Sequence, residues 1–258
     1  MLETSINLSR LGGLKRIALY GNPGTQKGRR KGGKTTVALF QSNPTLAGDF
    51  KIRKAIHYPD RSKELAEFIG IMLGDGGVST KHQLTITYNR ITDSKYAEFV
   101  CGLIKKLFSV DYHIRHRKGN NGADIIISSS NLVDCLLEQG LVSGNKVKKQ
   151  VKVPEWIRMD FEYQIACLRG LLDTDGGLYL HQYYSNGKRY EYLKLCFTNR
   201  SKPLLLFVFN TLKSLKYKVF LKGDHVSIFS TEEVKRYFHE IGSHNFKHKN
   251  KFENYFLN

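Results

Sequence analysis

The chain has 258 residues, of which 41% are hydrophobic and 12% are aromatic, enough for a packed core. Lys and Arg number 41 against 23 Asp and Glu, so the formal net charge of +18 predicts a polyanionic partner, with nucleic acid favoured over an anionic membrane surface. The sequence has neither an apolar run long enough to cross a membrane nor a secretory signal pattern, which predicts a soluble intracellular protein, in a prokaryotic cytoplasm or an organelle.

The first quarter of the chain, residues 1–63, is a basic segment with thirteen Lys and Arg against three Asp and Glu. Helices are expected at 8–19 and 34–41, but neither has enough periodic apolar residues to close a core by itself. We therefore predict a basic N-terminal extension that contacts DNA. It is expected to become ordered when it binds a partner or to lie on the surface of the main domain.

Residues 28–36 read GRRKGGKTT, which matches the phosphate-binding pattern G-x-x-x-x-G-K-[ST]. A nucleotide-binding loop with this pattern follows a buried strand and opens a helix in an α/β sheet. Here the preceding segment is YGNPGTQK and the following helix ends before SNP, so ATP binding is not expected. The stretch instead predicts contacts with DNA phosphates from a flexible glycine frame. The basic residues expected to make them are Lys27, Arg29, Arg30, Lys31 and Lys34.

From residue 64 the sequence repeats itself with a spacing of about one hundred residues. Helix, strands, helix, strands and helix follow in the same order in both copies, with the first repeat at 64–150 and a linker plus the second repeat at 151–258. The aligned segments are FIGIMLGDGGV (68–78) with LRGLLDTDGGL (168–178), TYNR (87–90) with FTNR (197–200), and IISSSNLVDCLLEQG (126–140) with IFSTEEVKRYFHEIG (228–242).

The strands of each copy alternate between apolar and polar residues, which predicts antiparallel sheets with one face on a core and one polar, basic face. Leu84, Ile86 and Tyr88 are expected to face the core, as are Leu193, Leu195 and Phe197 in the second copy. The other face suits a groove of duplex DNA. The residues expected to contact DNA there are Gln83, Thr85, Thr87, His113, Arg115 and Arg117 in the first copy, and Tyr192, Lys194, Lys216, Lys218 and Lys222 in the second.

Small residues recur on one face of the first helix of each repeat. Gly70 and Gly74 are four residues apart, as are Gly170 and Thr174. Small side chains at this spacing allow two helices to approach closely, so we expect the two copies to pack against each other about a pseudo-two-fold axis.

Asp75 and Asp175 then meet at two adjoining helix C-termini, where a carboxylate is unfavourable because that end of the helix dipole is already negative. A Mg²⁺ ion held by these carboxylates and by the carbonyl oxygens of Gly74 and Thr174 removes the cost. Metal ions held there over a phosphodiester predict metal-assisted hydrolysis. The alternative, ordinary helix-terminal acids before C-cap glycines, suits one copy better than two copies in register.

FIGIMLGDG (68–76) and LRGLLDTDG (168–176) resemble the two signature helices of the LAGLIDADG homing endonucleases in their single-chain, two-motif form. The resemblance covers about residues 64–258. The second copy follows the nine-letter motif closely, whereas Leu73 stands where the first copy would carry the motif's earlier, non-metal-binding acid. The resemblance implies an α+β fold in which two pseudo-symmetric αββαββα repeats form a DNA-binding saddle.

The resemblance also implies a functional monomer that makes a site-specific double-strand break in a long, nearly palindromic DNA target, across the minor groove and leaving short 3′ overhangs. The family's catalytic acid maps to Asp75 and Asp175, which would share two or three Mg²⁺ ions, with Mn²⁺ as a substitute. Basic or amide side chains near the metals are implied as well. By position, the candidates are Lys146, Lys148, Lys247, Lys249, Asn89 and Asn199.

Two further patterns bear on the function. His244 and His248 are four residues apart, but no third ligand has a helpful spacing for a metal site. A self-splicing intein needs a nucleophilic first residue and a terminal His-Asn, whereas the chain begins Met1-Leu2 and ends Leu257-Asn258, so a free-standing, intron-encoded enzyme is expected.

Two alternatives from other functional classes stay open. One is an RNA maturase that assists intron splicing, with intron RNA as its partner, and the other is a DNA-binding regulator that keeps the fold without cleaving. The presence of both acids argues against the regulator and says little about the maturase. The cysteines are isolated in sequence and predict buried free thiols, not zinc ligands or disulfides; they are Cys101, Cys135, Cys167 and Cys196.

Overall fold

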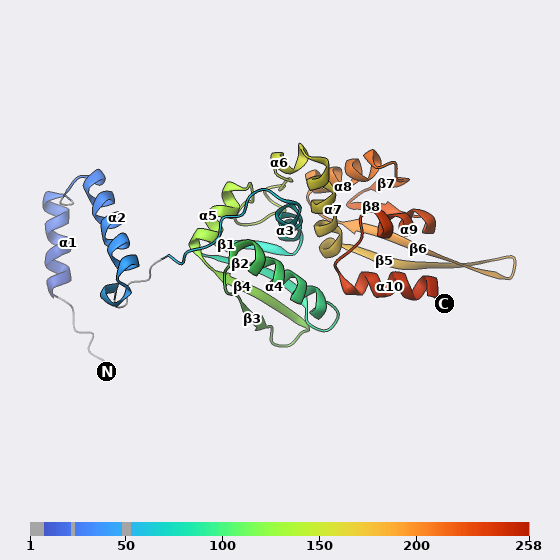
Figure 1. Ribbon diagram of the computed structural model, residues 1–258, viewed down its shortest axis with the longest axis horizontal. Coiled ribbons are helices and arrows are strands. Elements are labelled where there is room, and N and C mark those ends of the chain that lie inside the picture. The colour runs from blue at the N-terminus through green and yellow to red at the C-terminus, as the bar shows by residue number, and fades with distance from the viewer. Residues whose placement is uncertain (1–7, 22–23, 48–52, 258) are drawn as a thin grey trace. The chain divides into compact units, whose positions relative to one another are not determined.

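The computed structural model describes residues 8–21, 24–47 and 53–257 (Figure 1). The chain divides into two compact units, Met1–Arg53 and Lys54–Asn258. Met1-Leu2 and Asn258, on which the intein argument depends, lie outside the described residues.

The first unit contains the helices α1 (Leu8–Tyr20) and α2 (Gln26–Ser42) and the short 3-10 helix η1 (Pro44–Ala47). Thr25 is the N-cap of α2, and its hydroxyl accepts a hydrogen bond from the backbone N–H of Gly28 at 3.1 Å. α2 buries none of its residues. Its helical state therefore depends on capping and on local propensity more than on packing.

The stretch GRRKGGKTT lies inside α2, so the prediction of a flexible glycine frame was wrong. The Thr25 cap and the good helix formers Gln, Lys and Arg offset the unfavourable propensity of the glycines. Helical hydrogen bonds occupy most of the amides that a phosphate-binding loop would present. Lys27, Lys31 and Lys34 follow at intervals of four and three residues, so these exposed side chains share one face of the helix.

The second unit holds two successive α+β repeats. The elements of the first are α3 (Lys63–Gly74), β1 (Gly76–Thr80), β2 (Gln83–Asn89), α4 (Ser94–Phe108), β3 (His113–His116), β4 (Gly122–Ser128) and α5 (Ser130–Glu138). Those of the second are α6 (Glu155–Arg158), α7 (Phe161–Asp175), β5 (Gly176–Ser185), β6 (Lys188–Thr198), α8 (Lys202–Ser214), β7 (Val219–Lys222), β8 (His225–Ile228), α9 (Thr231–Glu240) and α10 (Phe246–Leu257).

Each repeat forms a four-stranded antiparallel sheet, with the order β1-β2-β4-β3 in the first and β5-β6-β8-β7 in the second. The predicted alternation is confirmed, since Leu84 and Ile86 are buried in β2, as are Leu193, Leu195 and Phe197 in β6. α4 and α5 pack on β2, and α8 and α9 pack on β6. The apolar face of each sheet is therefore covered by helices, and the opposite face stays open.

The signature helices α3 and α7 pack directly against each other in the middle of the second unit (Figure 1). A Cβ atom placed on Gly70 would lie 2.3 Å from the carbonyl oxygen of Cys167, and one on Gly170 would lie 2.3 Å from that of Glu67. Such distances exclude any side chain at these two positions. The close approach expected from the glycine spacing is confirmed, and each helix contributes one glycine to the crossing.

Two expectations about the second repeat need correction. Lys216 and Lys218 are not on a strand, because Lys216 occupies the turn after α8 with a φ of 65° and β7 begins only at Val219. In the segment with His244 and His248, α10 begins at Phe246, between the two histidines. His248 is buried in α10, whereas His244 precedes that helix, so the two do not share a helical face.

Three of the four predicted buried thiols are buried, namely those of Cys101, Cys135 and Cys167, and Cys196 is half-buried. All four are free. Within the described ranges, no helix combines the length and the apolar character that a membrane span requires.

Candidate metal centre and nucleic-acid interface

The two predicted catalytic acids lie where a signature helix gives way to a strand. Asp75 caps α3, and its backbone N–H donates to the carbonyl of Ile71. Asp175 is the last residue of α7, and the N–H of the following Gly176 donates to the carbonyl of Leu172. In each repeat the next residue begins the first strand of the sheet. Each carboxylate is therefore fixed at the junction between the helix pair and a sheet.

The two helix ends adjoin. A Cβ on Gly74 would lie 2.0 Å from Oγ1 of Thr174 and 3.5 Å from Oδ2 of Asp175. The Asp175 carboxylate therefore lies beside Gly74 at the end of α3, and Gly74 directly precedes Asp75 in the chain. The structure brings these two sequence-predicted residues together.

Burial by surrounding protein atoms raises the pKa values of both acids. Surrounding protein atoms raise the pKa of Asp75 to about 7, although its outer edge is exposed, and the neighbouring Asp175 charge adds to the rise. Burial also raises the pKa of Asp175, while a hydrogen bond from Asn199 and the charge of Lys146 oppose the rise. Raised pKa values mean that the ionised carboxylates are unfavourable here. A bound cation would stabilise their ionised form.

Lys146 is the predicted lysine that the structure brings closest to this centre. Its Nζ donates to the carbonyl oxygens of Leu73, at 2.8 Å, and of Gly74. Burial lowers the pKa of Lys146, whereas the charges of Asp175 and Asp75 raise it. The ammonium group therefore neutralises part of the negative C-terminus of α3 as well as the two acids.

The other three predicted lysines differ in how near they lie to this centre. Lys247 forms an ion pair with Asp93 at 2.8 Å, and its charge acts to lower the pKa of Asp75, so it lies near the first acid. Lys148 is exposed, and its backbone N–H donates to the side chain of Asn145. Lys249 is half-buried in α10. In the contacts described, Lys146 alone of these four lysines bonds to the end of a signature helix.

The two predicted asparagines are not equivalent. Nδ2 of Asn199 donates to Oδ2 of Asp175 at 2.7 Å, so Asn199 belongs to the centre. The side-chain oxygen of each asparagine accepts a hydrogen bond from the backbone amide two residues on, that of Ile91 or Ser201, but no contact described joins Asn89 to Asp75. The prediction that Asn89 serves as the counterpart of Asn199 was wrong.

The strand register explains the error. Gly76 pairs with Ile86, and Gly176 pairs with Phe197, so equivalent positions of β2 and β6 differ by 111 residues, whereas the sequence alignment used 110. The position that matches Asn199 in the first repeat is therefore Tyr88, one residue before Asn89. The first repeat therefore has no asparagine at the strand position from which Asn199 reaches Asp175.

A cavity of about 390 Å³ adjoins the acids on the side of the second repeat. Its lining combines an ammonium, carboxylates, an amide and a guanidinium, as a site for an ion and a phosphate requires. The polar residues that line it are Lys146, Asp175, Thr198, Asn199, Arg200, Ser201 and Asp224.

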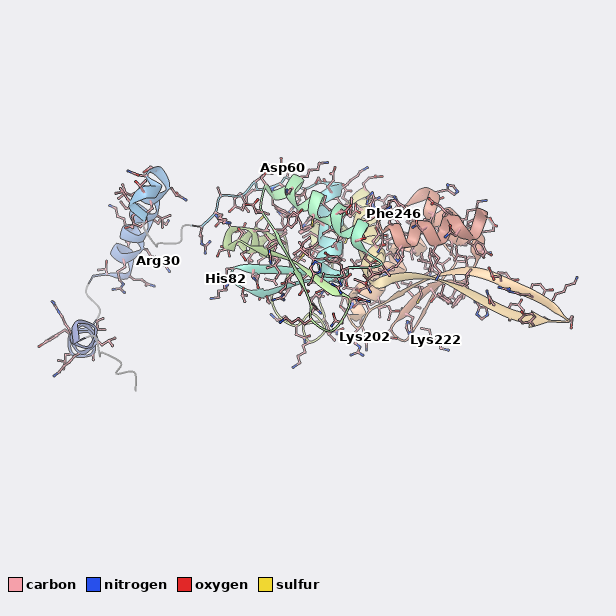
Figure 2. All side chains as sticks on the ribbon, turned by 90° about the horizontal axis from the view of Figure 1, so that it is seen from below. Arg30, Asp60, His82, Lys202, Lys222 and Phe246 are labelled. Atoms are coloured by element: carbon pink, nitrogen blue, oxygen red, sulfur yellow. The ribbon has the colours of Figure 1, made fainter. Side chains whose placement is uncertain are left out.

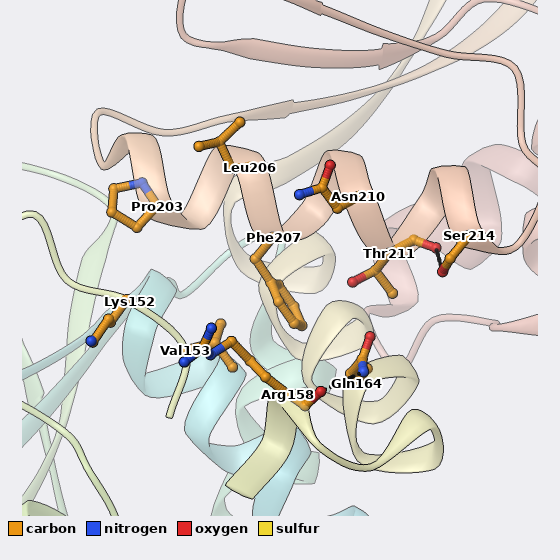
Figure 3. Close-up of a pocket in the computed structure, with 10 residues that line it drawn as sticks. All are labelled: Lys152, Val153, Arg158, Gln164, Pro203, Leu206, Phe207, Asn210, Thr211 and Ser214. Carbon is orange, nitrogen blue, oxygen red and sulfur yellow. Dashed lines mark hydrogen bonds between the residues drawn. The ribbon is translucent and has the colours of Figure 1, made fainter. Parts of the chain in front are cut away.

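A second cavity, of about 460 Å³, lies beside α8 and the start of α7 (Figure 3). Its polar residues include Lys152, Arg158, Gln164 and Asn210, and the lining has no acidic side chain. Hard divalent cations prefer carboxylate oxygens, so this cavity does not suit them.

The polar face of the first sheet carries a buried acid that the sequence did not reveal as important. The side chain of Asp124 has no exposed surface, and it accepts hydrogen bonds from Thr87 at 2.9 Å, Arg115 at 3.0 Å and Arg117. Burial alone would raise its pKa, but the hydrogen bonds from Arg117, Arg115 and Thr87 outweigh burial and hold the pKa at about 2. The two guanidinium groups predicted to contact DNA are thus oriented by Asp124 while they stay largely exposed.

We expect Asp124→Asn to lower the free energy of unfolding by about 3 kcal/mol at pH 7, because it leaves two guanidinium groups without their buried anion. The folded-state pKa lies below the unfolded value, so this stabilisation is present above about pH 4 and is lost as the pH falls through about 2. Urea unfolding from pH 7 down to pH 2 measures it. The exposed Asp111→Asn is the control; equal stability of the two variants at pH 7 would contradict the assignment.

The remaining predicted contact residues lie on the same open faces. Gln83 and Thr85 are half-buried on β2, His113 is exposed on β3, and Tyr192 is exposed on β6. Lys218 is exposed just before β7, and Lys222, which Figure 2 labels, is exposed at the end of that strand. Lys194 lies over the ring of Phe229, with its Nζ 5.1 Å from the ring centre.

A buried polar network behind the helix pair was not predicted. Glu67 accepts hydrogen bonds from Arg169 at 2.6 Å and contacts Nδ1 of His244 at 2.5 Å, and Asp173 accepts from Ser243 and from the backbone of His244. Glu67, Asp173 and His244 are close enough to hold a metal ion. Their ligand atoms are already bonded to one another, to Ser243 and to Arg169, so we assign them the structural role of anchoring the segment before α10 to α3 and α7.

No protein-family model matches the chain. Among curated proteins, a stretch of 123 residues, 47% of the chain, is 34% identical to part of the replication factor C small subunit of Methanocaldococcus jannaschii. The chain spans only 6% of the length of that protein.

Solved structures give a broader match. The meganuclease I-SmaMI bound to uncleavable DNA has a TM-score of 0.50 and 12% sequence identity, over 76% of this chain and 90% of that one. I-DmoI in complex with DNA and Mn has a TM-score of 0.46 and 21% identity, over 70% and 97%. The N-terminal LAGLIDADG domain of WhiA has a TM-score of 0.48 and 14% identity, over 72% and 83%. The chain has the LAGLIDADG fold.

Proposed function

From this fold and the paired acids, we propose that the protein is a site-specific homing endonuclease that makes a metal-dependent double-strand break in a long DNA target. The observation that carries the proposal is the meeting of Asp75 and Asp175 at the adjoining ends of α3 and α7. The reaction would be phosphodiester hydrolysis, one bond on each strand.

The residues at the centre fit a hard divalent cation such as Mg²⁺. Two carboxylates with raised pKa values adjoin the last carbonyl groups of two helices, which is an oxygen-only donor set. The carbonyl of Gly74 already attracts the ammonium of Lys146 and, having two lone pairs, can accept a second positive group. Asp75, Asp175 and the carbonyls of Gly74 and Thr174 would hold the ions, which supply an activated water and neutralise the leaving oxygen when bound.

The other side chains of the centre would position the reacting groups. Asn199 fixes the orientation of the Asp175 carboxylate through its hydrogen bond. Lys146 places a positive charge between the acids and the adjacent cavity, where it would stabilise negative charge on a phosphate. Gly70 and Gly170 keep the helix ends close enough for both acids to serve one centre.

The open faces of the two sheets would bind double-stranded DNA, with the basic side chains on phosphates and the polar side chains of β2 and β6 on base edges. The net charge of +18 supplies the attraction. We therefore expect binding to weaken steeply as the salt concentration rises.

The experiment begins with selection of a target sequence. Duplexes with a randomised central region would be selected by the full chain in Ca²⁺, and the selected duplex would then be incubated with Mg²⁺, with Mn²⁺ and with Ca²⁺. Double-strand cutting in Mg²⁺ or Mn²⁺ is the expected result. Tight binding without cutting in any metal would favour the regulator, and restored splicing of a host intron RNA without DNA cutting would favour the maturase.

Removing the first unit, residues 1–53, should weaken binding of the selected duplex by about tenfold or more at 150 mM salt, since each lost phosphate contact reduces affinity and the salt slope. The cut leaves Lys54, whose carbonyl accepts a hydrogen bond from Asn131. Fluorescence anisotropy at several salt concentrations measures the change. The full-length variant with Lys27, Lys31 and Lys34 replaced by Gln should lose much of the same affinity; unchanged binding in both proteins would contradict the role assigned to α2.

A further inference from the structure

The two sheets differ in the length of their first hairpin. β5 and β6 have ten and eleven residues, whereas β1 and β2 have five and seven. β8 pairs with β6 only from Leu195 to Thr198, so the outer part of the β5–β6 hairpin has no third strand beside it. This outer part, residues 179–194, which we call the arm, extends as a two-stranded ribbon beyond the rest of the second sheet (Figure 1).

One face of the arm carries a cluster of aromatic rings. Tyr183 pairs across the strands with Tyr190, and His181 pairs with Tyr192. The ring of Tyr183 stacks on Tyr190, with centres 5.2 Å apart, and on Tyr192, with centres 6.0 Å apart. All three tyrosines are exposed. They form an ordered aromatic surface that no other described element covers.

This aromatic face continues the open face of the second sheet. Side chains alternate along a strand, so Tyr190, Tyr192 and Lys194 point away from the core side, which carries Leu193 and Leu195. Lys188, next to the turn, shares their face. The arm therefore adds aromatic rings between two lysines to the surface that the proposed function assigns to DNA.

The opposite face of the arm satisfies its own polar groups. Glu191 accepts hydrogen bonds from Gln182 at 2.6 Å and from Arg189 at 2.7 Å. The hydroxyl of Tyr255 in α10 donates to the backbone carbonyl of Glu191, which ties the arm to the body of the unit. The arm is thus held in place by α10, and its tyrosine face stays exposed.

The length of the arm sets how far it reaches from the paired acids. Asn186, at its tip, is eleven residues beyond Asp175, whereas Lys81, at the tip of the β1–β2 hairpin, is six residues beyond Asp75. A difference of five residues corresponds to about 17 Å along extended strands, or roughly five base pairs of B-DNA.

We propose that the arm reads duplex DNA beyond the reach of the first repeat, so that the half-site bound by the second repeat is longer by about three to five base pairs. Tyr183, Tyr190 and Tyr192 are the residues that determine specificity there. This inference rests on the proposed function and adds that the two half-sites of the target differ in length.

The stacking of the tyrosines favours duplex over single-stranded DNA. Single-stranded DNA binds by stacking its bases on free ring faces, and Tyr183 already stacks on two neighbouring rings. Tyrosine hydroxyls can donate to and accept from base edges and phosphates, and ring edges can contact thymine methyl groups. A two-stranded ribbon also fits the major groove, which is about 12 Å wide. The lysines at both ends of the cluster suit phosphates.

The test compares hydroxyl-radical footprints of the full chain and a short-arm variant on the selected duplex, in Ca²⁺. The variant lacks residues 182–185 and 188–191 and keeps the Asn186-Gly187 turn, where both residues have positive φ values that suit a two-residue hairpin. Removal of four residues from each strand preserves the pleat and the pairing of His181 with Tyr192. A double variant, Tyr183→Ser with Tyr190→Ser, keeps the arm and removes two rings. Tyr184→Ser, on the opposite face of the same strand, is its matched control.

The full chain should protect about three to five more base pairs on one side of the centre than on the other, and the short-arm variant should lose that excess while it protects the rest. The double variant should relax base preference at the outer positions by about tenfold, and Tyr184→Ser should leave it unchanged. Equal protection on both sides, or an excess that survives in the short-arm variant, would overturn the inference alone. Failure to select any duplex would overturn the proposed function and the inference with it.

Discussion

Asp75→Asn and Asp175→Asn should each abolish double-strand cutting of the selected duplex, by on the order of a thousandfold or more, while binding in Ca²⁺ changes far less. Asparagine keeps the shape of aspartate and removes the negative charge that would hold the cation. The two acids share one centre at adjoining helix ends, so loss of either should impair both strands. Single-turnover cleavage of a duplex labelled on both strands measures the effect on each strand.

A thermal measurement tests the same site without DNA. The pKa of Asp75 is raised to about 7, above its unfolded value, so the folded protein holds this proton more tightly and the metal-free fold loses stability as the pH rises from about 4 through 7. Asp75→Asn should therefore raise the melting temperature of the metal-free protein at pH 8 and change it little at pH 4. Mg²⁺ should raise the melting temperature of the wild type at pH 8 and have a smaller effect on the variant.

The exposed Asp111→Asn serves as the control in both measurements. Asp111 also follows a helix, but that helix is α4, which is not one of the two signature helices. It should cut DNA like the wild type. Cutting that survives in Asp75→Asn and in Asp175→Asn, or an equal response of wild type and variants to Mg²⁺, would contradict the assignment of these acids.

Gly70→Ala and Gly170→Ala should have the largest effects on stability. A Cβ at either position would lie 2.3 Å from a backbone carbonyl oxygen of the other helix, so the helices would have to move apart. Overpacking against backbone is expected to cost about 3 kcal/mol or more. For a unit of this size the melting temperature would fall by roughly 6–12 °C. Separation of the helices would also move Asp75 from Asp175, so cutting should fall even at temperatures where the variants stay folded.

Gly102→Ala in α4 is the matched control, because a Cβ on Gly102 meets no atom within 4 Å. Alanine is a better helix former than glycine, so this variant should be more stable by up to about 1 kcal/mol. Calorimetry on the three variants separates the two outcomes. Destabilisation of Gly102→Ala as large as that of Gly70→Ala would show that tight helix packing is not the cause.

Much of the fold could be predicted because its periodic patterns are strong. The alternation of β2, the repeated helix with its glycines and the acid at its end all depend on local spacing, and the structure places them as expected. A single sequence reveals both features because each is locally unfavourable. Glycine destabilises the interior of a helix, and an acid destabilises a helix C-terminus, so a tertiary contact or a bound cation has to explain their presence.

The mistakes arose where a tertiary or capping interaction decided the outcome. The glycines of α2 suggested a flexible loop, yet the Thr25 cap and the surrounding helix formers make the segment helical. Asn89 and Asn199 align in the sequence at an offset of 110 residues. Strand pairing across each sheet gives an offset of 111 residues between the repeats. Asp124 gave no local signal, because its importance comes from two arginines that reach it from a neighbouring strand and the turn after it.

The most direct test of the proposed chemistry is to incubate a plasmid carrying the selected target with the full chain and Mg²⁺ and to sequence both ends of the product. One cut in each strand, a few base pairs apart and near the middle of the target, is the result expected from two acids at one centre. The cuts should leave short 3′ overhangs. Intact plasmid bound by the protein at every concentration of Mg²⁺ and Mn²⁺ would contradict the account.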